Sequence, residues 1–194
     1  MATKFTGYNG DDYVAITIAQ MNNGDKVTEI ASSALIDKKN LKAITIPKTI
    51  TTIGANAFGT SDTNGCTNLA LAIYEGSLAE WCEVSATSSR STPTYYAKDI
   101  IINGKLVTSI DTSVKKIAGC NFYRCKSLRT ADLSEVTKIG AQAFNTCINL
   151  ETVVLSKNLE EIPRYCFTGC TNLTEINIPA AVSTIGNYAF WGGN

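Results

Sequence analysis

The residues most able to do chemistry in this chain are its cysteines, because the sequence contains seven of them and no histidine. Without histidine there is no Ser-His-Asp triad, no Cys-His dyad and no histidine-ligated metal. Two stretches, AFNTC at 143–147 and CFTGC at 166–170, each place a cysteine three residues after a phenylalanine. Such a spacing could belong to a metal site, a disulfide, a reactive thiol or a packed core.

The cysteines recur at one position of successive similar segments. Cys66, Cys125, Cys147 and Cys170 occupy this position, and Gly193 stands there in the last segment. If the segments stack, these side chains point the same way at a strand-like spacing of about 4.8 Å. Parallel side chains hold their Cβ atoms too far apart for disulfides. We therefore expect a ladder of free, buried thiols.

Zinc is the sharper alternative, because Cys166 and Cys170 have the spacing of metal ligands. Cys166, however, stands where other segments have Ala57, Ala143 and Ala189, so it reads as a small core residue. A catalytic thiol would need a neighbouring Lys or Arg to lower its pKa, and the sequence nominates none. We predict no metal site, no cofactor and no catalytic residue.

The elements that carry these cysteines form an internal repeat. Segments starting at Leu106, Leu128, Leu150 and Leu173 lie 22 to 23 residues apart and share the pattern L-x-x-I-x-I-P-x-x-V-x-x-I-G-x-x-A-F-x-x-C, as does an earlier segment from Leu41. L-x-x-I-x-I is the alternation of a short strand with one buried face. One unit cannot bury its apolar face alone, so about seven coils must stack around a continuous core.

This pattern resembles the BspA-like leucine-rich repeats of bacterial surface proteins, over residues 27–194. The resemblance implies an α/β repeat solenoid: a right-handed, curved leucine-rich repeat array with a parallel β-sheet on its concave face and short strands, turns or short helices elsewhere. It also implies a non-enzymatic role in adhesion or protein binding, at the cell surface or secreted. Residues 1–26 are expected to be an N-terminal capping segment, in which 13–18 (YVAITI) is the first strand of a hairpin.

One coil carries an insertion at about 74–105. A capping box from Ser77 to Glu80 predicts a helix at about 77–84, and Asn103-Gly104 predicts a hairpin between two β-prone runs. Aromatic residues are enriched in interfaces, which makes the insertion a candidate contact region through Trp81, Tyr95 and Tyr96. For Trp81 the competing interpretation is that it packs the helix against the solenoid.

The remaining candidate binding residues lie on strands and at the C-terminal end. Residues that alternate with the buried positions would face the concave surface, and these are Thr45, Asp132, Val154 and Asn177. No cap follows the last repeat, so Trp191 is a candidate for contact with a partner or with a second copy.

Charge and hydropathy exclude two partner classes. The charges of the 17 basic and 17 acidic residues cancel, which disfavours nucleic acid as a partner. The sequence contains no window of 18 or more uncharged apolar residues, so we predict no membrane insertion. We predict a module that binds a protein or glycan over several repeats. The alternative is a structural component of a virion, filament or larger surface protein, which associates through its uncapped C-terminal repeat. Residues 1–25 lack a signal-peptide pattern, so an intracellular or virion-associated location stays open.

Overall fold

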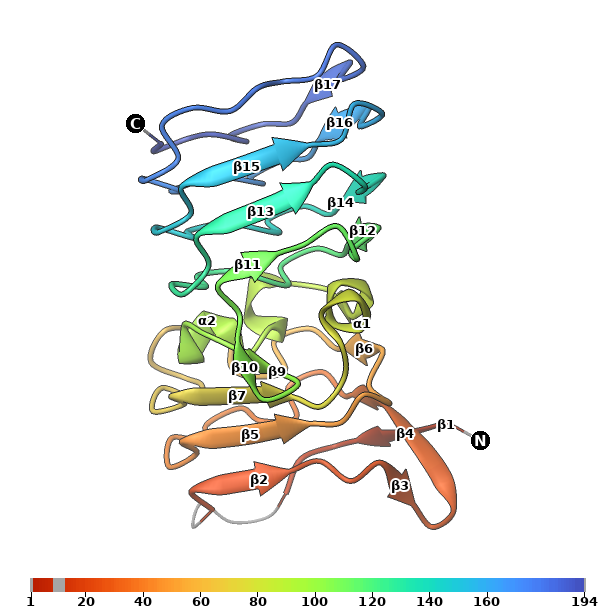
Figure 1. Cartoon of the computed structure of the whole chain (residues 1–194). Helices are drawn as coiled ribbons and strands as arrows, with labels where there is room; N and C mark the ends of the chain where they lie inside the picture. Colours follow the sequence, from red (N-terminus) through yellow and green to blue (C-terminus); the bar gives the residue numbers. More distant parts are fainter. Residues whose placement is uncertain (1, 9–12, 194) are drawn as a thin grey trace.

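The computed structural model describes residues 2–8 and 13–193, which form a column of stacked coils (Figure 1). Most coils contribute one strand to a long-strand face and one to a short-strand face. The long-strand face comprises β2 (Ala15–Thr17), β5 (Ala43–Ile46), β7 (Leu71–Tyr74), β9 (Ile101–Ile102), β11 (Ser109–Ile110), β13 (Thr130–Leu133) and β15 (Thr152–Leu155). The short-strand face comprises β1 (Ala2–Phe5), β4 (Asp25–Ile30), β6 (Thr52–Ile53), β8 (Ser85–Ala86), β12 (Lys116–Ile117), β14 (Lys138–Ile139), β16 (Glu161–Ile162) and β17 (Thr184–Ile185).

The other elements interrupt this regular stack. They are β3 (Met21–Asn22), β10 (Lys105–Leu106), the helices α1 (Leu78–Glu83) and α2 (Thr94–Ala97), and a short 3-10 helix (Ser89–Ser91). The chain is thus a β-solenoid of about seven turns with parallel sheets and few helices, which confirms the repeat fold expected from the sequence.

Strand alternation places every second side chain in the core. In β13 and β15, Ala131, Leu133, Val153 and Leu155 are buried, while the residues between them face outward. The two strands pair in parallel, so that equivalent residues of neighbouring coils lie side by side. Burial of these repeated apolar positions is the main stabilising contribution, because a single coil has no second layer to cover it.

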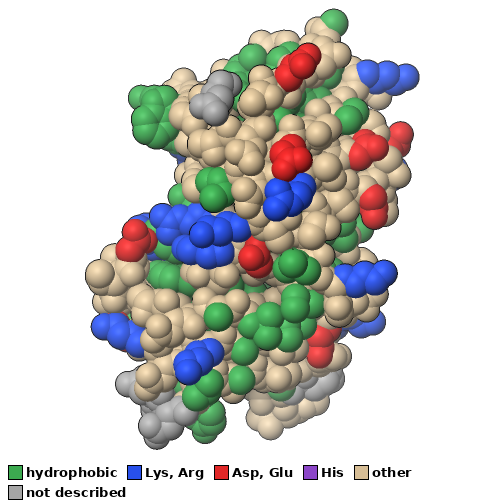
Figure 2. All heavy atoms as spheres, turned by 60° about the vertical axis from the view of Figure 1, so that its left-hand side comes forward, with side chains coloured by type: hydrophobic (Ala, Val, Ile, Leu, Met, Phe, Trp, Pro, Cys, Tyr) green, Lys and Arg blue, Asp and Glu red, His purple; other side chains and the backbone are tan. Residues whose placement is uncertain are grey.

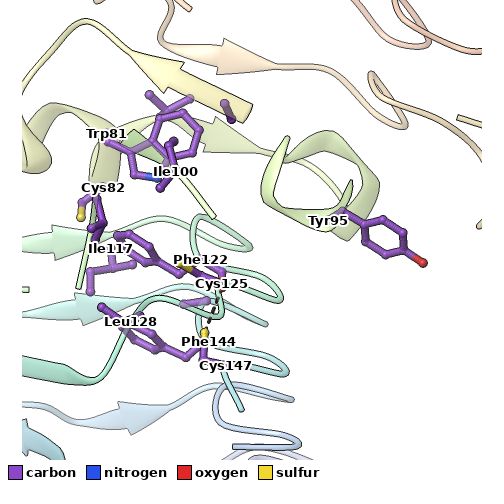
Figure 3. Packing of buried hydrophobic residues seen from close by; sticks show 14 of the residues in the cluster. Trp81, Cys82, Tyr95, Ile100, Ile117, Phe122, Cys125, Leu128, Phe144 and Cys147 are labelled. Atoms are coloured by element: carbon purple, nitrogen blue, oxygen red, sulfur yellow. Dashed lines mark hydrogen bonds between the residues drawn. The ribbon is translucent and has the colours of Figure 1, made fainter. Parts of the chain in front are cut away.

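The turn of each coil stacks aromatic rings above one another. Phe122, Phe144, Phe167 and Phe190 have ring centroids 5.8, 5.3 and 5.6 Å apart, with planes within 10° of parallel. Backbone hydrogen bonds hold the same register, since the N–H of each of the first three phenylalanines donates to the next coil at 2.8–3.0 Å. The core is therefore continuous along the stack (Figure 3).

Glycine is required where coils approach most closely. A Cβ added to Gly140 would lie 2.3 Å from the backbone nitrogen of Gly119 in the preceding coil. A side chain at this position would push the two coils apart, which explains the glycine after the isoleucine in the repeat pattern.

The insertion folds as the sequence predicts. α1 follows Ser77, whose hydroxyl accepts a hydrogen bond from the Glu80 N–H while the Glu80 carboxylate accepts one from the Ser77 N–H. β9 and β10 pair antiparallel around Asn103-Gly104. The insertion also divides the long-strand face, because β10 ends one sheet (β10-β9-β7-β5-β2) and β11 begins the next (β11-β13-β15).

The predicted N-terminal hairpin is wrong in its first strand. Ala15–Thr17 pairs in parallel with β5 as part of the long-strand face, and the hairpin is formed by β3 and β4 around Asn23-Gly24. Both turn residues have positive φ, which suits a tight two-residue turn. The alternating apolar pattern is the same in both pairings, so it could not indicate the partner strand.

The strand expected in the last repeat is also wrong. Residues 173–178 follow the path of the earlier coils but form no strand paired with β15. β15 is therefore the last strand of the long-strand face among the described residues. Ile178 stands in the repeat position that Leu133 and Leu155 fill in β13 and β15, but unlike them it is exposed.

Candidate partner-binding surfaces

The cysteines form a structural ladder. All seven are free and buried, which confirms the free, buried thiols expected at Cys66, Cys125, Cys147 and Cys170. Three thiols donate a hydrogen bond to a backbone carbonyl of the preceding coil, namely Cys66 to Leu35 O (3.2 Å), Cys147 to Phe122 O (3.0 Å) and Cys170 to Phe144 O (3.1 Å). The repeated cysteine is thus a small apolar residue that also connects adjacent coils.

Burial suppresses the reactivity of these thiols. It raises the pKa of Cys66 and Cys170 to about 12 and that of Cys125 to about 11. The thiolate is the nucleophile and the metal ligand, so little of either chemistry is available near neutral pH. Among residues 2–8 and 13–193 no group of His, Cys, Asp or Glu side chains could hold a metal ion.

Trp81 anchors the insertion and does not reach the surface. Its side chain is 1% exposed, and its indole N–H donates to Asn121 O at 3.2 Å. The Asn121 amide donates in return to the carbonyls of Trp81 and Val84, at the end of α1. The interpretation that Trp81 packs the helix against the solenoid is confirmed, and the prediction that Trp81 contacts a partner is wrong.

Sequence reasoning missed Asn121. It stands in the position that other coils fill with Ala143 and Ala189, and it is almost fully buried. A polar residue at a small apolar position was the available signal. Its role depends on α1 lying directly against this coil, which the sequence alone did not indicate.

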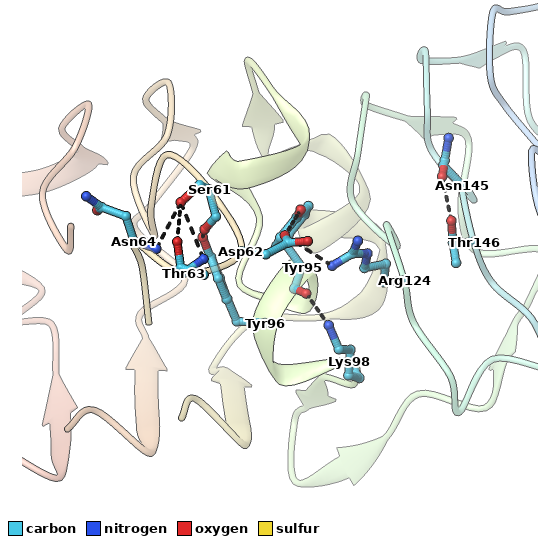
Figure 4. Close-up of polar contacts among 10 residues, drawn as sticks. All are labelled: Ser61, Asp62, Thr63, Asn64, Tyr95, Tyr96, Lys98, Arg124, Asn145 and Thr146. Carbon is cyan, nitrogen blue, oxygen red and sulfur yellow. Dashed lines mark hydrogen bonds and ion pairs between the residues drawn. The ribbon is translucent and has the colours of Figure 1, made fainter. Parts of the chain in front are cut away.

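Tyr95 and Tyr96 are also buried, which removes them from the candidate contact surface. The Tyr95 hydroxyl donates to the Asp62 carboxylate, and the Tyr96 hydroxyl donates to Ser61 O at 2.8 Å (Figure 4). Both rings come from α2 in the large insertion, whereas their partners lie in the short loop after Phe58. The two irregular segments of the chain therefore meet on one side of the solenoid.

Three cationic side chains surround the Tyr95 ring. The guanidinium carbon of Arg124 lies 4.1 Å from the ring centroid, that of Arg90 lies 5.0 Å away, and Lys98 Nζ lies 5.8 Å away. Tyr123 stacks against the same ring at 5.5 Å. We call these five residues the arginine–tyrosine cluster; it lies at mid-height of the stack, where Figure 2 shows Lys and Arg side chains gathered.

The cluster is only partly neutralised. Asp62 lies 3.8 Å from Arg124 Nη1, and its side chain is 65% exposed. The pKa of Asp62 is lowered, first by the hydrogen bond from Tyr95 and then by Arg124. The pKa of Lys98 is lowered by burial and by the charges of Arg124 and Lys126. Positive charges thus crowd one another here, although the whole chain is neutral.

The four strand-face candidates are not equivalent. Thr45 and Asp132 are half-buried, and the Asp132 carboxylate accepts a hydrogen bond from Ser134 N at 3.1 Å. Val154 pairs with Asp132 in register and is 48% exposed. Asn177 is exposed but lies outside any strand. These side chains therefore do not form one uniform surface.

An apolar patch that the sequence pattern does not indicate lies on the first of the two sheets of the long-strand face, β10-β9-β7-β5-β2. Leu71 and Leu106 are 36% and 50% exposed, and Ile73 and Ile101 are half-buried. Strand pairing joins Ile73 to Ile101 and Ile101 to Leu106, so the side chains adjoin across β7, β9 and β10. We call these four residues the apolar patch. A groove of about 410 Å³ beside it is lined by Leu106, Thr108, Ser109, Asp111 and neighbouring residues.

The last coil exposes a second apolar surface. Trp191 is 68% exposed, Tyr188 57% and Ile185 54%. A cavity of about 220 Å³ opens beside Phe190 and Ile176. Tyr188 stacks on Tyr165 of the preceding coil at 5.2 Å, and Ile185 is exposed although the equivalent Ile162 is buried. No helix in the described part of the chain is long and apolar enough to cross a membrane.

Comparison with solved structures finds the same fold in bacterial leucine-rich repeat proteins. A Treponema pallidum leucine-rich repeat protein is 24% identical, with a TM-score of 0.58 over 95% of this chain and 78% of that one. A leucine-rich cell surface protein of Faecalibacterium prausnitzii is 27% identical (TM-score 0.54; 98% and 47% covered). A Bacteroides ovatus leucine-rich repeat protein is 23% identical (TM-score 0.56; 93% and 50% covered). The chain spans about half the length of the last two.

The repeat register agrees with a family model. A comparison with curated protein sequences finds no significant match. The model of the BspA-type leucine-rich repeat region matches residues 13–76 and 105–194 in six copies, leaving out the α1 and α2 insertion. The stacked phenylalanines, the cysteine ladder and the glycine contacts are the physical content of that pattern. This chain belongs to the BspA-type leucine-rich repeat family.

Proposed function

We propose that this chain is a non-enzymatic module that binds a partner protein through the apolar patch on its long-strand face. The family consists of bacterial surface-type repeat proteins that generally bind other proteins. The observation that carries the proposal is the apolar patch, in which Leu71, Ile73, Ile101 and Leu106 adjoin on an open sheet surface. An interface commonly has an apolar centre and a polar rim, and the patch supplies such a centre.

Polar residues border this patch and supply the rim. Thr45 pairs with Ile73 on one side, and Lys105 precedes Leu106 on the other. The groove beside Leu106 could receive a side chain of the partner, as buried anchors do in other interfaces. The proposed site thus combines a flat sheet surface with one recess.

A location at the cell surface is part of the proposal. It draws on the family and on the Faecalibacterium prausnitzii neighbour, which is described as a cell surface protein. Immunolabelling of intact and permeabilised cells of the source organism tests this location. Labelling that requires permeabilisation would contradict it.

Variants of the patch test the binding role. Leu71→Asn together with Leu106→Asn removes the apolar centre. The control is Val154→Asn, which makes a comparable change at an exposed apolar residue of β15, in the second sheet of the face. Wild type and Val154→Asn, immobilised in parallel, should retain the same partner from surface extracts, while the patch variant should lose it. A partner retained equally by all three proteins would refute the assignment of the patch.

A second candidate function is self-association through the last coil. The observation that favours it is the exposure of Trp191, Tyr188 and Ile185 on the outer side of the terminal coil. A second copy that covers this surface would bury the apolar side chains as a neighbouring coil does within the stack. Light scattering of wild type and Trp191→Asp tests this: a concentration-dependent oligomer that the variant abolishes supports it, and a monomeric wild type rules it out.

A further inference from the structure

The arginine–tyrosine cluster holds cationic groups whose hydrogen-bonding capacity is unused. Arg124 lies against the Tyr95 ring, and within the described residues its guanidinium makes an ion pair at 3.8 Å but no hydrogen bond. Arg90 Nε is buried and has no hydrogen-bond partner in the described part of the chain. Lys98 Nζ, by contrast, donates to Tyr95 O at 2.7 Å. The unused donors thus belong to the two arginines.

The aromatic rings hold the Arg124 side chain in place before any ligand arrives. A guanidinium stacked on an aromatic face loses conformational freedom in the free protein, so less is lost when it binds. Its planar fork then matches the two oxygens of a carboxylate. Arg124 is 29% exposed, so this fork is accessible from solvent.

Local charge favours an anionic partner. Arg90, Lys98, Arg124 and the exposed Lys126 come together from the insertion and the following coil. Two acids lie among them, Asp62 beside Arg124 and Asp99, which accepts a hydrogen bond from Ser127 N at 2.6 Å. The cationic side chains therefore outnumber the carboxylates.

We propose that the arginine–tyrosine cluster binds an acidic segment of a partner protein, with Arg124 as the main carboxylate-binding residue and Asp62 as a built-in competitor. Asp62 already lies where a carboxylate of the partner would approach the guanidinium. The 3.8 Å separation between Asp62 and Arg124 and the exposure of Asp62 make this internal ion pair weak. A carboxylate of the partner can therefore share the guanidinium with Asp62 or displace Asp62 from it.

An acidic peptide fits this surface better than a sulfated glycan. Sugar recognition commonly uses an open aromatic face, whereas Tyr95 and Tyr96 are 3% and 8% exposed and are covered by protein. What the cluster presents to solvent is guanidinium and ammonium groups. The inference rests on the proposed role in protein binding, but it uses a surface formed by residues outside the apolar patch.

The binding of labelled hexaglutamate by the intact chain, measured by fluorescence anisotropy, tests the proposal. Arg124→Gln should weaken binding about tenfold, because a hydrogen-bonded charge pair is lost. Asp62→Asn should strengthen it about threefold, because an exposed competing charge is removed while an oxygen remains to accept the Tyr95 hydroxyl. Arg129→Gln removes the same charge from an exposed arginine paired with Glu151, and it should have little effect.

Four results would overturn the proposal. The first is that wild type fails to bind hexaglutamate more tightly than hexaglutamine. The second is that Arg124→Gln loses no more affinity than Arg129→Gln. The third is that Asp62→Asn does not strengthen binding. The fourth is that a sulfated oligosaccharide binds more tightly than hexaglutamate. Circular dichroism of each variant confirms that it is folded.

The proposed function and this inference can fail separately. If hexaglutamate binding fails while the apolar-patch variant still loses its partner, only the inference is overturned. If the partner is insensitive to Leu71→Asn with Leu106→Asn but hexaglutamate binding depends on Arg124, only the assignment of the patch is overturned.

Discussion

Replacement of Cys147 by alanine tests whether the cysteine ladder stabilises the stack by more than packing. The Cys147 thiol is buried between neighbouring coils and donates to Phe122 O at 3.0 Å. Cys166 is buried to the same degree, but within the described residues its thiol makes no hydrogen bond, and it occupies the alanine position of the repeat. Cys166→Ala therefore removes the same atom without the hydrogen bond.

The expected cost follows from two contributions. Removing one buried heavy atom costs about 1 kcal/mol in lost burial and packing. Loss of the thiol hydrogen bond adds about 1 kcal/mol. This cost is small for a buried group because the Phe122 carbonyl still accepts a hydrogen bond from the Cys125 N–H. Cys147→Ala should thus lower the free energy of unfolding by about 2 kcal/mol, and Cys166→Ala by about 1 kcal/mol.

Urea unfolding followed by circular dichroism measures this difference. The thermal midpoint should fall by about 2–4 °C for each kcal/mol in a chain of this size. Hydrogen exchange of the Phe122 and Phe144 coils localises the effect, since a solenoid coil contacts only its neighbours. Equal losses for Cys147→Ala and Cys166→Ala would refute the reasoning that the thiol acts as a hydrogen-bond donor between coils.

Three further perturbations have definite expected outcomes. Burial raises the pKa of Cys66 from 9.0 to about 12. The stability that the buried neutral thiol contributes is therefore present below pH 9.0 and is lost as the pH rises toward 12, which urea midpoints at increasing pH measure. Gly140→Ala should destabilise by about 3 kcal/mol in urea unfolding, because the new Cβ would overlap Gly119. Asn121→Ala should cost about 2 kcal/mol through two lost hydrogen bonds and should shift Trp81 fluorescence to the red.

Each of these predictions has a control. Alkaline destabilisation that Cys66→Ala leaves unchanged would show that this thiol is not among its causes. Gly193→Ala places a methyl group 3.3 Å from the nearest backbone oxygen and should be tolerated, so equal losses at Gly140 and Gly193 would contradict the steric argument. An unshifted indole spectrum in Asn121→Ala, measured with Trp191→Phe as the background, would show that Asn121 does not hold α1.

Much of the fold follows from local patterns. The alternation in L-x-x-I-x-I predicts the inward residues of β13 and β15, and the capping box at Ser77 predicts the start of α1. The pair Asn103-Gly104 predicts the β9–β10 turn. These features depend on residues within a few positions of one another, so the sequence contains the information needed to recognise them.

The candidate sites are less predictable because their residues meet across coils. Tyr95 was a candidate contact residue on its type alone, and it is buried by Asp62 and Arg124, which lie about 30 positions away on either side. Leu71 and Leu106 look unremarkable in sequence, and the patch appears only when β9 and β10 extend the sheet of β7. No local pattern encodes such meetings.

The sequence by itself determined the repeat length, the inward positions and the stacking of equivalent residues, because an apolar face that recurs every 22 to 23 residues can be buried only by its neighbours. Only the tertiary structure decided how the irregular segments dock. Their contacts depend on loop closure and on packing against a particular coil, which brought Trp81 into the core and Arg124 onto Tyr95. The apolar patch and the arginine–tyrosine cluster both include residues of the insertion that interrupts the repeat.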